Sequence, residues 1–259
     1  MATITPVITG TIITMARGIT MTDDPIRAEI RSGLPTRQML QLMAWLSPAF
    51  PVGAFSYSHG IEQAVEVGLV IDRASTAEWI FGILRFGAGW IDAGLFLAAH
   101  RAVKATDIEA LRQVACLAAA WRGTAETALE SSAQGTAFVT TLNAGWELPE
   151  VRRWFSALER PPAYAVAVAI AAAVTGIAEE SALAAYLQAL AANLISAAQR
   201  LVPLGQTDGQ RILSSVTAKL AELVTAARLL PPEDLGSAAL MVDWTSAQHE
   251  TQYTRLFRS

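Results

Sequence analysis

A regular spacing of apolar residues in the last third of the chain constrains the fold most. The intervals are four, three, four, three and four residues through Leu183, Leu187, Leu190, Leu194, Ala197 and Leu201. Such intervals place side chains on one face of an α-helix, so this stretch predicts a helix packed within a bundle. A similar stripe predicts a neighbouring helix through Leu213, Val216, Leu220, Leu223 and Ala227.

Helical signals recur along the rest of the chain, and no run of alternating apolar and polar residues indicates a strand. Ser75-Thr-Ala-Glu78 and Thr106-Asp-Ile-Glu109 have the spacing of capping boxes, which predicts helices over 75–103 and 106–122. Glycines within the first of these predict close helix contacts or a break. Pro149 suits the first position of a later helix. We therefore expect an all-α fold, a single bundle of about eight to ten helices.

The beginning of the chain differs from this helical body. It alternates Ile with Thr and then becomes polar, without the cationic start and continuous apolar run of a signal peptide. We expect residues 1–36 to be a poorly ordered extension and residues 37–259 to form the helical domain. Translation from Met39 is the alternative interpretation.

Composition raises the question of a membrane, because the mean hydropathy is +0.35. The uncharged stretch 161–178 is just long enough to span a bilayer, but it consists mainly of Ala and Val, so we expect a buried helix of a soluble protein. The single cysteine, Cys116, excludes an internal disulfide. We expect it to be a small core residue in a cytoplasmic protein.

Several classes of chemistry lack their usual residues. The three histidines, His59, His100 and His249, are far apart in the sequence, and no metal-binding spacing such as HxxxH or CxxC occurs. PLGQTDGQR lacks the lysine of a phosphate-binding loop. The net charge of −4 gives no attraction to nucleic acid. We expect no metal, no cofactor and no catalysis, and the alternative is a helical enzyme whose site the sequence does not reveal.

Three irregular segments remain, and helix packing alone does not require sequences this specific. They are PVGAFSYSHGIE (Pro51–Glu62), PLGQTDGQR (Pro203–Arg211) and HETQYTRLFRS (His249–Ser259). We call them the first, second and third segments. With no catalytic set among them, they predict surfaces that bind other proteins.

Each segment also has a purely structural interpretation. In the first, Ser56 or Ser58 suits a helix N-cap, and His59 lies one turn from Glu62, which predicts a surface pair. The second suits an interhelical turn with an N-cap at Thr207 or Asp208. The third carries aromatic and basic residues typical of interfaces, and its alternative is docking onto its own bundle.

The three segments together resemble the UreF family of urease accessory proteins. The resemblance rests on LQLMAWLSPAFPVGAFSYSHGIE (Leu40–Glu62), RLVPLGQTDGQRIL (Arg200–Leu213) and the third segment, and it covers 40–259. It implies a dimerising, non-catalytic helical scaffold. Such a scaffold binds the accessory protein UreD/UreH and the GTPase UreG, which it gates or stimulates, so that nickel is inserted into apo-urease with GTP hydrolysis.

The resemblance also implies which residues contact these partners. We expect the second segment to contact the GTPase and the third to become ordered against UreD/UreH, being mobile alone. The expected partner-binding residues are Pro51, Gly53, Phe55, Tyr57, His59, Glu62, Pro203, Gly205, Gln206, Gln210, Arg211, Glu250, Tyr253, Arg255, Leu256, Phe257 and Arg258.

Overall fold

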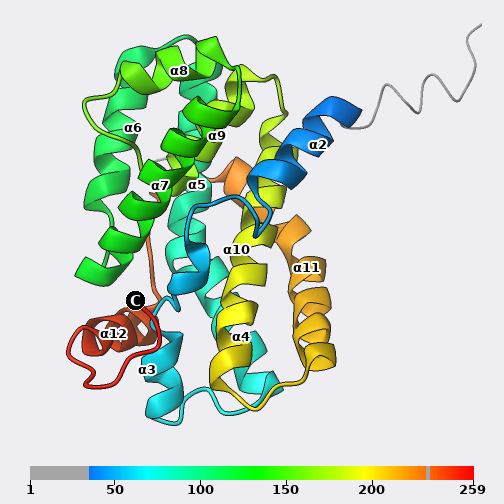
Figure 1. Ribbon diagram of the computed structural model, residues 1–259, viewed down its shortest axis with the longest axis vertical. Coiled ribbons are helices and arrows are strands. Elements are labelled where there is room, and N and C mark those ends of the chain that lie inside the picture. Colours follow the sequence, from blue (N-terminus) through cyan, green and yellow to red (C-terminus); the bar gives the residue numbers. More distant parts are fainter. Residues whose placement is uncertain (1–34, 232–233) are drawn as a thin grey trace, which may run out of the picture. The chain divides into compact units, whose positions relative to one another are not determined.

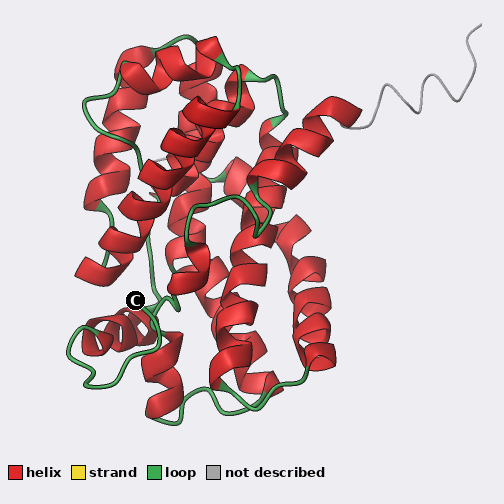
Figure 2. Ribbon diagram, in the orientation of Figure 1, coloured by secondary structure: helices red, strands yellow, loops and turns green. Residues whose placement is uncertain are grey.

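The computed structural model describes residues 35–231 and 234–259, and the expected extension over 1–36 lies almost wholly outside them. Within these residues the fold is all α-helical without strands, as predicted (Figure 2). The elements are α2 (Thr36–Trp45), the 3-10 turn η1 (Ala54–Ser56), α3 (Ile61–Glu66), α4 (Arg73–Phe86), α5 (Ala88–Lys104), α6 (Ile108–Ala120), α7 (Ala125–Gly145), α8 (Pro149–Ser156), α9 (Tyr164–Val174), α10 (Glu179–Leu201), α11 (Gln206–Leu229) and α12 (Leu240–His249).

Helix α9 forms the centre of one end of the bundle, surrounded by α5, α7, α8 and α10 (Figure 1). Every residue from Ala165 to Ala173 is buried, which agrees with the buried helix expected over 161–178. Two other stretches, 73–104 and 179–201, are long and apolar enough to cross a membrane, and 67% and 50% of their apolar windows are buried in the fold.

The apolar stripes face the core as the spacing predicted. Leu183, Leu187 and Leu194 are buried in α10, and the second stripe is buried along α11 from Val216 to Ala227. Helices α10 and α11 pack side by side. These two helices lead into and out of the second segment, so their packing fixes where that segment lies.

The helix starts differ from the predictions at four places. Helix α3 follows Gly60, so neither Ser56 nor Ser58 occupies its N-cap position. Asp72 caps α4 and Ser75 is the third helical residue, because the Asp72 carboxylate accepts the Ser75 N–H at 2.9 Å. Asp107 caps α6, whereas Thr106 has φ +58° and ends the preceding turn. Gly205, not Thr207 or Asp208, precedes α11. Neighbouring polar residues compete for the cap, and spacing alone does not choose between them.

Two further expectations about the helices have clear outcomes. The stretch expected as one helix over 75–103 is broken at Gly87 into α4 and α5, so one glycine does mark a break. Cys116 is exposed, and the prediction of a core position was wrong. The buried face of α6 passes through Leu111 and Ala118, seven residues apart, and Cys116 lies off that face.

Candidate functional site

The first and second segments meet at α3. The first contains η1 and enters α3, while the second connects α10 to α11 at the lower end of the view in Figure 1. Ala64, Val70 and Val202 form a buried apolar cluster that Leu204 covers. This cluster packs the start of the second segment against α3, the helix into which the first segment leads, although about 140 residues separate the two segments.

The third segment packs against the first. The backbone N–H groups of Leu256 and Phe257 donate to the two carboxylate oxygens of Glu62, at 2.6 and 2.9 Å. The Arg258 N–H donates to the Ser56 carbonyl at 2.8 Å. The Ser58 N–H and hydroxyl both donate to the carbonyl of Ser259. Backbone groups at the end of the chain are thus held by the first segment.

An aromatic contact adds to this docking. The Phe257 ring is 4% exposed, and the Arg200 guanidinium lies 4.2 Å above its centroid. Arg200 also donates to the Phe55 carbonyl at 2.8 Å. The third segment is therefore seated on its own bundle, which is the alternative that the sequence left open, whereas we expected it to be mobile in the chain alone.

His249, at the end of α12, contacts carboxylates of both α3 and α7. Its Nε2 lies 3.0 Å from a Glu62 oxygen and its Nδ1 lies 2.8 Å from a Glu126 oxygen of α7. Arg255 donates to Glu126 at 3.2 Å. The His249 side chain is fully buried between these carboxylates. We call Glu62, His249 and Glu126 the buried triad.

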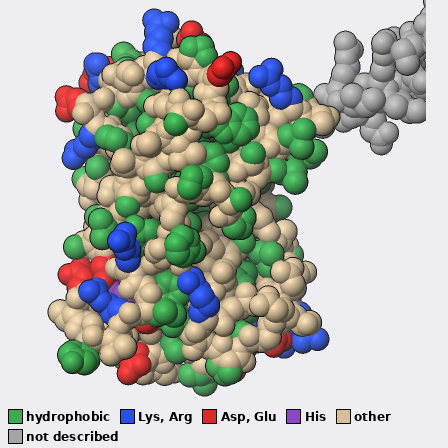
Figure 3. All heavy atoms as spheres, viewed as in Figure 1, with side chains coloured by type: hydrophobic (Ala, Val, Ile, Leu, Met, Phe, Trp, Pro, Cys, Tyr) green, Lys and Arg blue, Asp and Glu red, His purple; other side chains and the backbone are tan. Residues whose placement is uncertain are grey.

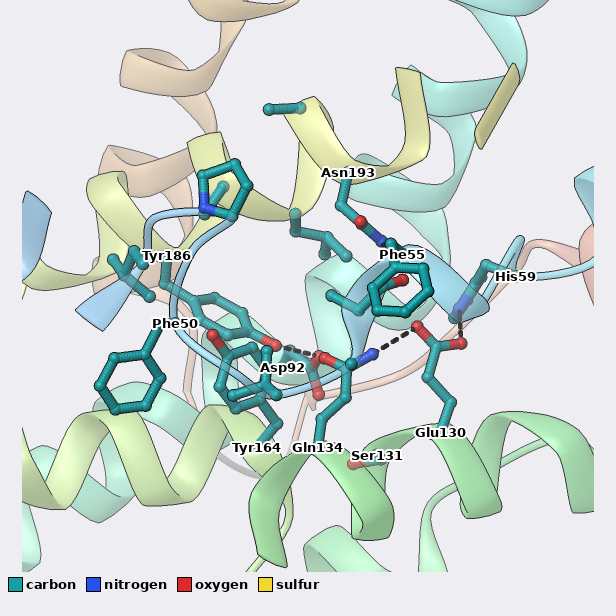
Figure 4. Close-up of a pocket in the computed structure, with 18 of the residues that line it drawn as sticks. Phe50, Phe55, His59, Asp92, Glu130, Ser131, Gln134, Tyr164, Tyr186 and Asn193 are labelled. Carbon is teal, nitrogen blue, oxygen red and sulfur yellow. Dashed lines mark hydrogen bonds and ion pairs between the residues drawn. The ribbon is translucent and has the colours of Figure 1, made fainter. Parts of the chain in front are cut away.

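A second histidine makes a parallel contact beside it. His59 Nδ1 lies 3.0 Å from a Glu130 oxygen, Gln134 donates to the other Glu130 oxygen at 3.1 Å, and the Ser259 hydroxyl also reaches Glu130 (Figure 4). Burial alone would lower the pKa of His59, but the charge and hydrogen bond of Glu130 outweigh burial and raise it above the ordinary 6.5.

A sharp turn delivers His59 to this position. His59 has φ +57° and Gly60 has φ +78°, so two successive left-handed residues turn the chain into α3. A Cβ on Gly60 would lie 2.9 Å from the Ser246 backbone nitrogen of α12. The glycine therefore permits both the turn and the close approach of α3 to α12.

The expected surface pair of His59 and Glu62 was wrong. Both side chains are buried, and each bonds to a different partner. The sequence analysis also missed Glu126 and Glu130. Their spacing of four residues on one face of α7, in a helix without Lys or Arg, was the available signal.

The expected partner-binding residues divide by exposure. Tyr57, His59, Glu62 and Phe257 are buried and act within the fold. Phe55, Tyr253 and Leu256 are 69%, 103% and 63% exposed, which is unusual for large apolar side chains. Gly53 is half-buried, and the exposed remainder comprises Pro51, Pro203, Gly205, Gln206, Gln210, Arg211, Glu250, Arg255 and Arg258. Charged side chains are sparse over the face shown in Figure 3.

The second segment presents polar groups to solvent. Gln199 contacts Gly205 and Gln206 at 3.4 Å, and Arg211 pairs with Asp208 at 3.2 Å within the first turn of α11. Within 35–231 and 234–259, no hydrogen bond or ion pair links this segment to the third. The two segments are separate candidate contact regions on either side of α3.

A cavity of about 240 Å³ lies beneath the loop 46–55, between α5, α7, α9 and α10 (Figure 4). Its charged groups and Tyr186 are engaged with one another. Asp92 accepts from Arg122 at 2.7 Å and from the Tyr186 hydroxyl at 2.8 Å, while Glu130 binds His59. Burial raises the pKa of Tyr186, and the Asp92 charge adds to this rise. In the described part of the chain, no group of three or more His, Cys, Asp or Glu is placed to hold a metal ion.

Comparison with known proteins identifies close relatives. The UreF family model matches residues 70–217. The urease accessory protein UreF of Bradyrhizobium diazoefficiens is 44% identical over 238 residues, 92% of this chain and 98% of that protein. The UreF proteins of Granulibacter bethesdensis and Rhodopseudomonas palustris (strain BisB5) are 47% and 48% identical, over 85% and 91% of this chain and 94% and 95% of their own lengths.

Proposed function

Because this chain belongs to the UreF family of urease accessory proteins, we propose that it is a non-catalytic scaffold for the maturation of urease. The scaffold binds UreD/UreH and UreG as a cytoplasmic homodimer. The assembled complex delivers nickel to apo-urease, and GTP hydrolysis by UreG, which the scaffold gates, times the delivery. The chain itself needs no cofactor for this role.

One observation carries the proposal: the first and third segments form a single surface that is rigidly held and yet exposes large apolar groups. Backbone hydrogen bonds fix the third segment on Glu62 and Ser58, while Phe55, Tyr253 and Leu256 project to solvent. A backbone held in place before binding loses little conformational entropy when a partner covers it. This surface is suited to UreD/UreH.

The second segment supports a separate contact with UreG. Gln206, Gln210 and Arg211 are exposed at the start of α11, and none of them is needed to bury the core. Amide and guanidinium groups are suited to positioning water or stabilising charge at a nucleotide. We assign the gating of the GTPase to this loop.

Co-expression tests the proposal directly. The chain is produced with UreD/UreH and UreG, and the mixture is separated by size-exclusion chromatography with light scattering. The complex is then incubated with apo-urease, nickel and GTP, and urease activity is measured. We expect a complex that contains two copies of this chain and both partners, and nickel-dependent urease activity that disappears when this chain is omitted. A monomer that binds neither partner would contradict the scaffold function.

A further inference from the structure

The buried triad has a hydrogen-bond pattern that fixes where its protons lie. The Glu62 oxygens accept the N–H groups of Leu256 and Phe257 and also contact His249. Hydrogen bonds from two backbone N–H groups favour the ionised form of the Glu62 carboxylate, which has no hydrogen to donate. The His249 Nε2 facing Glu62 must therefore carry a hydrogen.

The other side of the imidazole then needs one more proton. His249 Nδ1 lies 2.9 and 2.8 Å from the two Glu126 oxygens. In a neutral ring whose Nε2 carries the hydrogen, Nδ1 has a bare lone pair, which repels an ionised carboxylate. A proton between His249 and Glu126 removes this repulsion, whether it resides on the ring or on the carboxyl.

We propose that His249 and Glu126 bind this extra proton when the third segment is seated, and that the proton positions the segment for docking. The proton fixes His249 between α7 and α3, and His249 in turn orients the Glu62 carboxylate that holds the segment's backbone. The triad is a positioning device, since none of its side chains is exposed to a partner.

The surroundings of the triad favour retention of the proton. Burial raises the pKa of Glu126, against the opposing effects of His249 and Arg255. Among the surrounding charged groups, Arg255 lowers and Glu250 raises the pKa of Glu126, and both belong to the third segment. Beside the triad, His59 of the first segment pairs with Glu130 of α7, and Asp243 of α12 interacts with the His59 charge. Arg255 and Glu250 oppose each other, so burial, the largest effect, decides the direction and favours an added proton on this pair.

Seating is therefore linked to pH. When the segment is unseated, the two buried carboxylates no longer hold this proton, so it is lost more readily than from the seated triad. Over the pH range in which the seated state binds one proton more than the unseated state, the equilibrium constant for seating falls by up to tenfold per pH unit, and the fall ends once the triad has released its proton. The consequence that docking weakens at alkaline pH rests on the proposed function, but the seating itself does not.

Hydrogen exchange on the full chain alone measures the seating. We expect the amides of Leu256 and Phe257 to be protected at pH 6, relative to a free peptide of the same sequence, and to lose protection progressively toward pH 9. Protection that is equal at both pH values overturns the proposal. Because no partner is present, this result is independent of whether the complex forms.

Two isosteric variants separate the proton from simple structure. Glu126→Gln supplies an amide N–H to the bare Nδ1, so the segment stays seated and its protection no longer falls with pH. Glu62→Gln points an amide N–H at groups that are themselves donors, so protection is lost at every pH. Glu150→Gln on exposed α8 is the matched control and leaves the profile unchanged. If Glu126→Gln retains the original pH dependence, the proposal is wrong.

A second measurement needs no substitution. ¹⁵N-histidine NMR of the unmodified chain reports whether each ring nitrogen is protonated. At pH 6 we expect His249 to show hydrogens at or shared with both nitrogens. A neutral ring whose Nδ1 neither carries a hydrogen nor accepts a hydrogen bond at that pH contradicts the proposal even if a variant fails to fold.

Discussion

The His249 Nε2 at the end of α12 lies 3.0 Å from a carboxylate oxygen of Glu62 in α3, although 187 residues separate the two in the sequence. This contact joins the first and third segments, which the sequence marked as unusual but could not pair. Glu62 also accepts hydrogen bonds from the backbone of Leu256 and Phe257. One buried carboxylate of α3 therefore holds the part of the third segment that exposes the Leu256 side chain.

Deleting residues 253–259 tests the role of the third segment. Helix α12 ends at His249, so we expect the helical circular-dichroism signal to remain. We expect binding to UreD/UreH to be lost, because the deletion removes the exposed side chains of Tyr253 and Leu256. The unfolding free energy falls by about 3–6 kcal/mol, since Glu62 loses two charge-assisted hydrogen bonds and the buried Phe257 ring is removed. Loss of the helical signal would instead make the segment essential to the fold.

Replacing the exposed side chains separates binding from stability. We expect Tyr253→Ala and Leu256→Ala each to weaken UreD/UreH binding at least tenfold in calorimetry, as central apolar contacts do. Their melting temperatures stay close to that of the parent, because exposed side chains contribute within about 0.5 kcal/mol to stability. Leu229→Ala is the control, because Leu229 is 78% exposed on α11 and lies outside the surface formed by the first and third segments. This variant should leave binding intact.

Substitutions in the second segment should impair the contact with UreG and leave the contact with UreD/UreH intact. In the double variant Gln210→Ala with Arg211→Ala, we expect the UreD/UreH complex to form while UreG recruitment or its rate of GTP hydrolysis falls. Phosphate release from the assembled complex measures this. Arg153→Ala, on exposed α8, removes an arginine elsewhere and serves as the control. Unchanged recruitment and hydrolysis in the double variant would move the GTPase contact away from this loop.

Local patterns were sufficient for the helices and their buried faces. The leucine stripe of α10 faces the core as its spacing requires, and Pro149 begins α8. Local patterns were less informative where adjacent residues compete, as Asp72 and Ser75 do for the start of α4. In Ala-rich α6 there is little contrast between faces, which is why the exposure of Cys116 was not anticipated.

The buried triad could not be read from the sequence, because its members belong to three distant elements. Glu62 and His249 lie in segments that the sequence marked, but Glu126 is one acidic residue among many near helix starts. Only the packing of α3, α7 and α12 shows that these carboxylates share one imidazole. Similarly, the sequence indicated Phe257 as a partner-binding residue, but it gave no sign that the Arg200 guanidinium lies above the Phe257 ring within the fold.

A glycine tests the packing of α7 against the start of α9. A Cβ on Gly135 would lie 2.0 Å from the Pro162 carbonyl oxygen, so the two segments must separate in Gly135→Ala. We expect a loss of about 1–3 kcal/mol in the free energy of unfolding, measured by urea denaturation. Gly82→Ala is the matched control, since a Cβ there meets nothing within 4 Å, and it should stabilise α4 by up to about 1 kcal/mol. Equal effects would contradict the close approach.

The last prediction concerns the pH dependence contributed by His59. Its pKa is raised above 6.5 because the Glu130 carboxylate outweighs burial, so its contribution to stability is complete below pH 6.5 and is lost as the pH rises through the raised pKa. In Glu130→Gln, burial and the Arg122 charge dominate, and the pKa of His59 falls below 6.5. The sign then reverses, and stability is lost as the pH falls.

Two measurements check this reversal. Titration of the His59 ring protons by NMR should show a lower pKa in Glu130→Gln than in the parent. Urea unfolding across pH 5.5–8.5 should show the parent gaining stability relative to the variant toward acid, because only the parent keeps a favourable site for the histidine charge. Since His249 and His100 remain in both proteins, the difference between them isolates His59. An unchanged titration of His59 in the variant would mean that Glu130 does not control its charge.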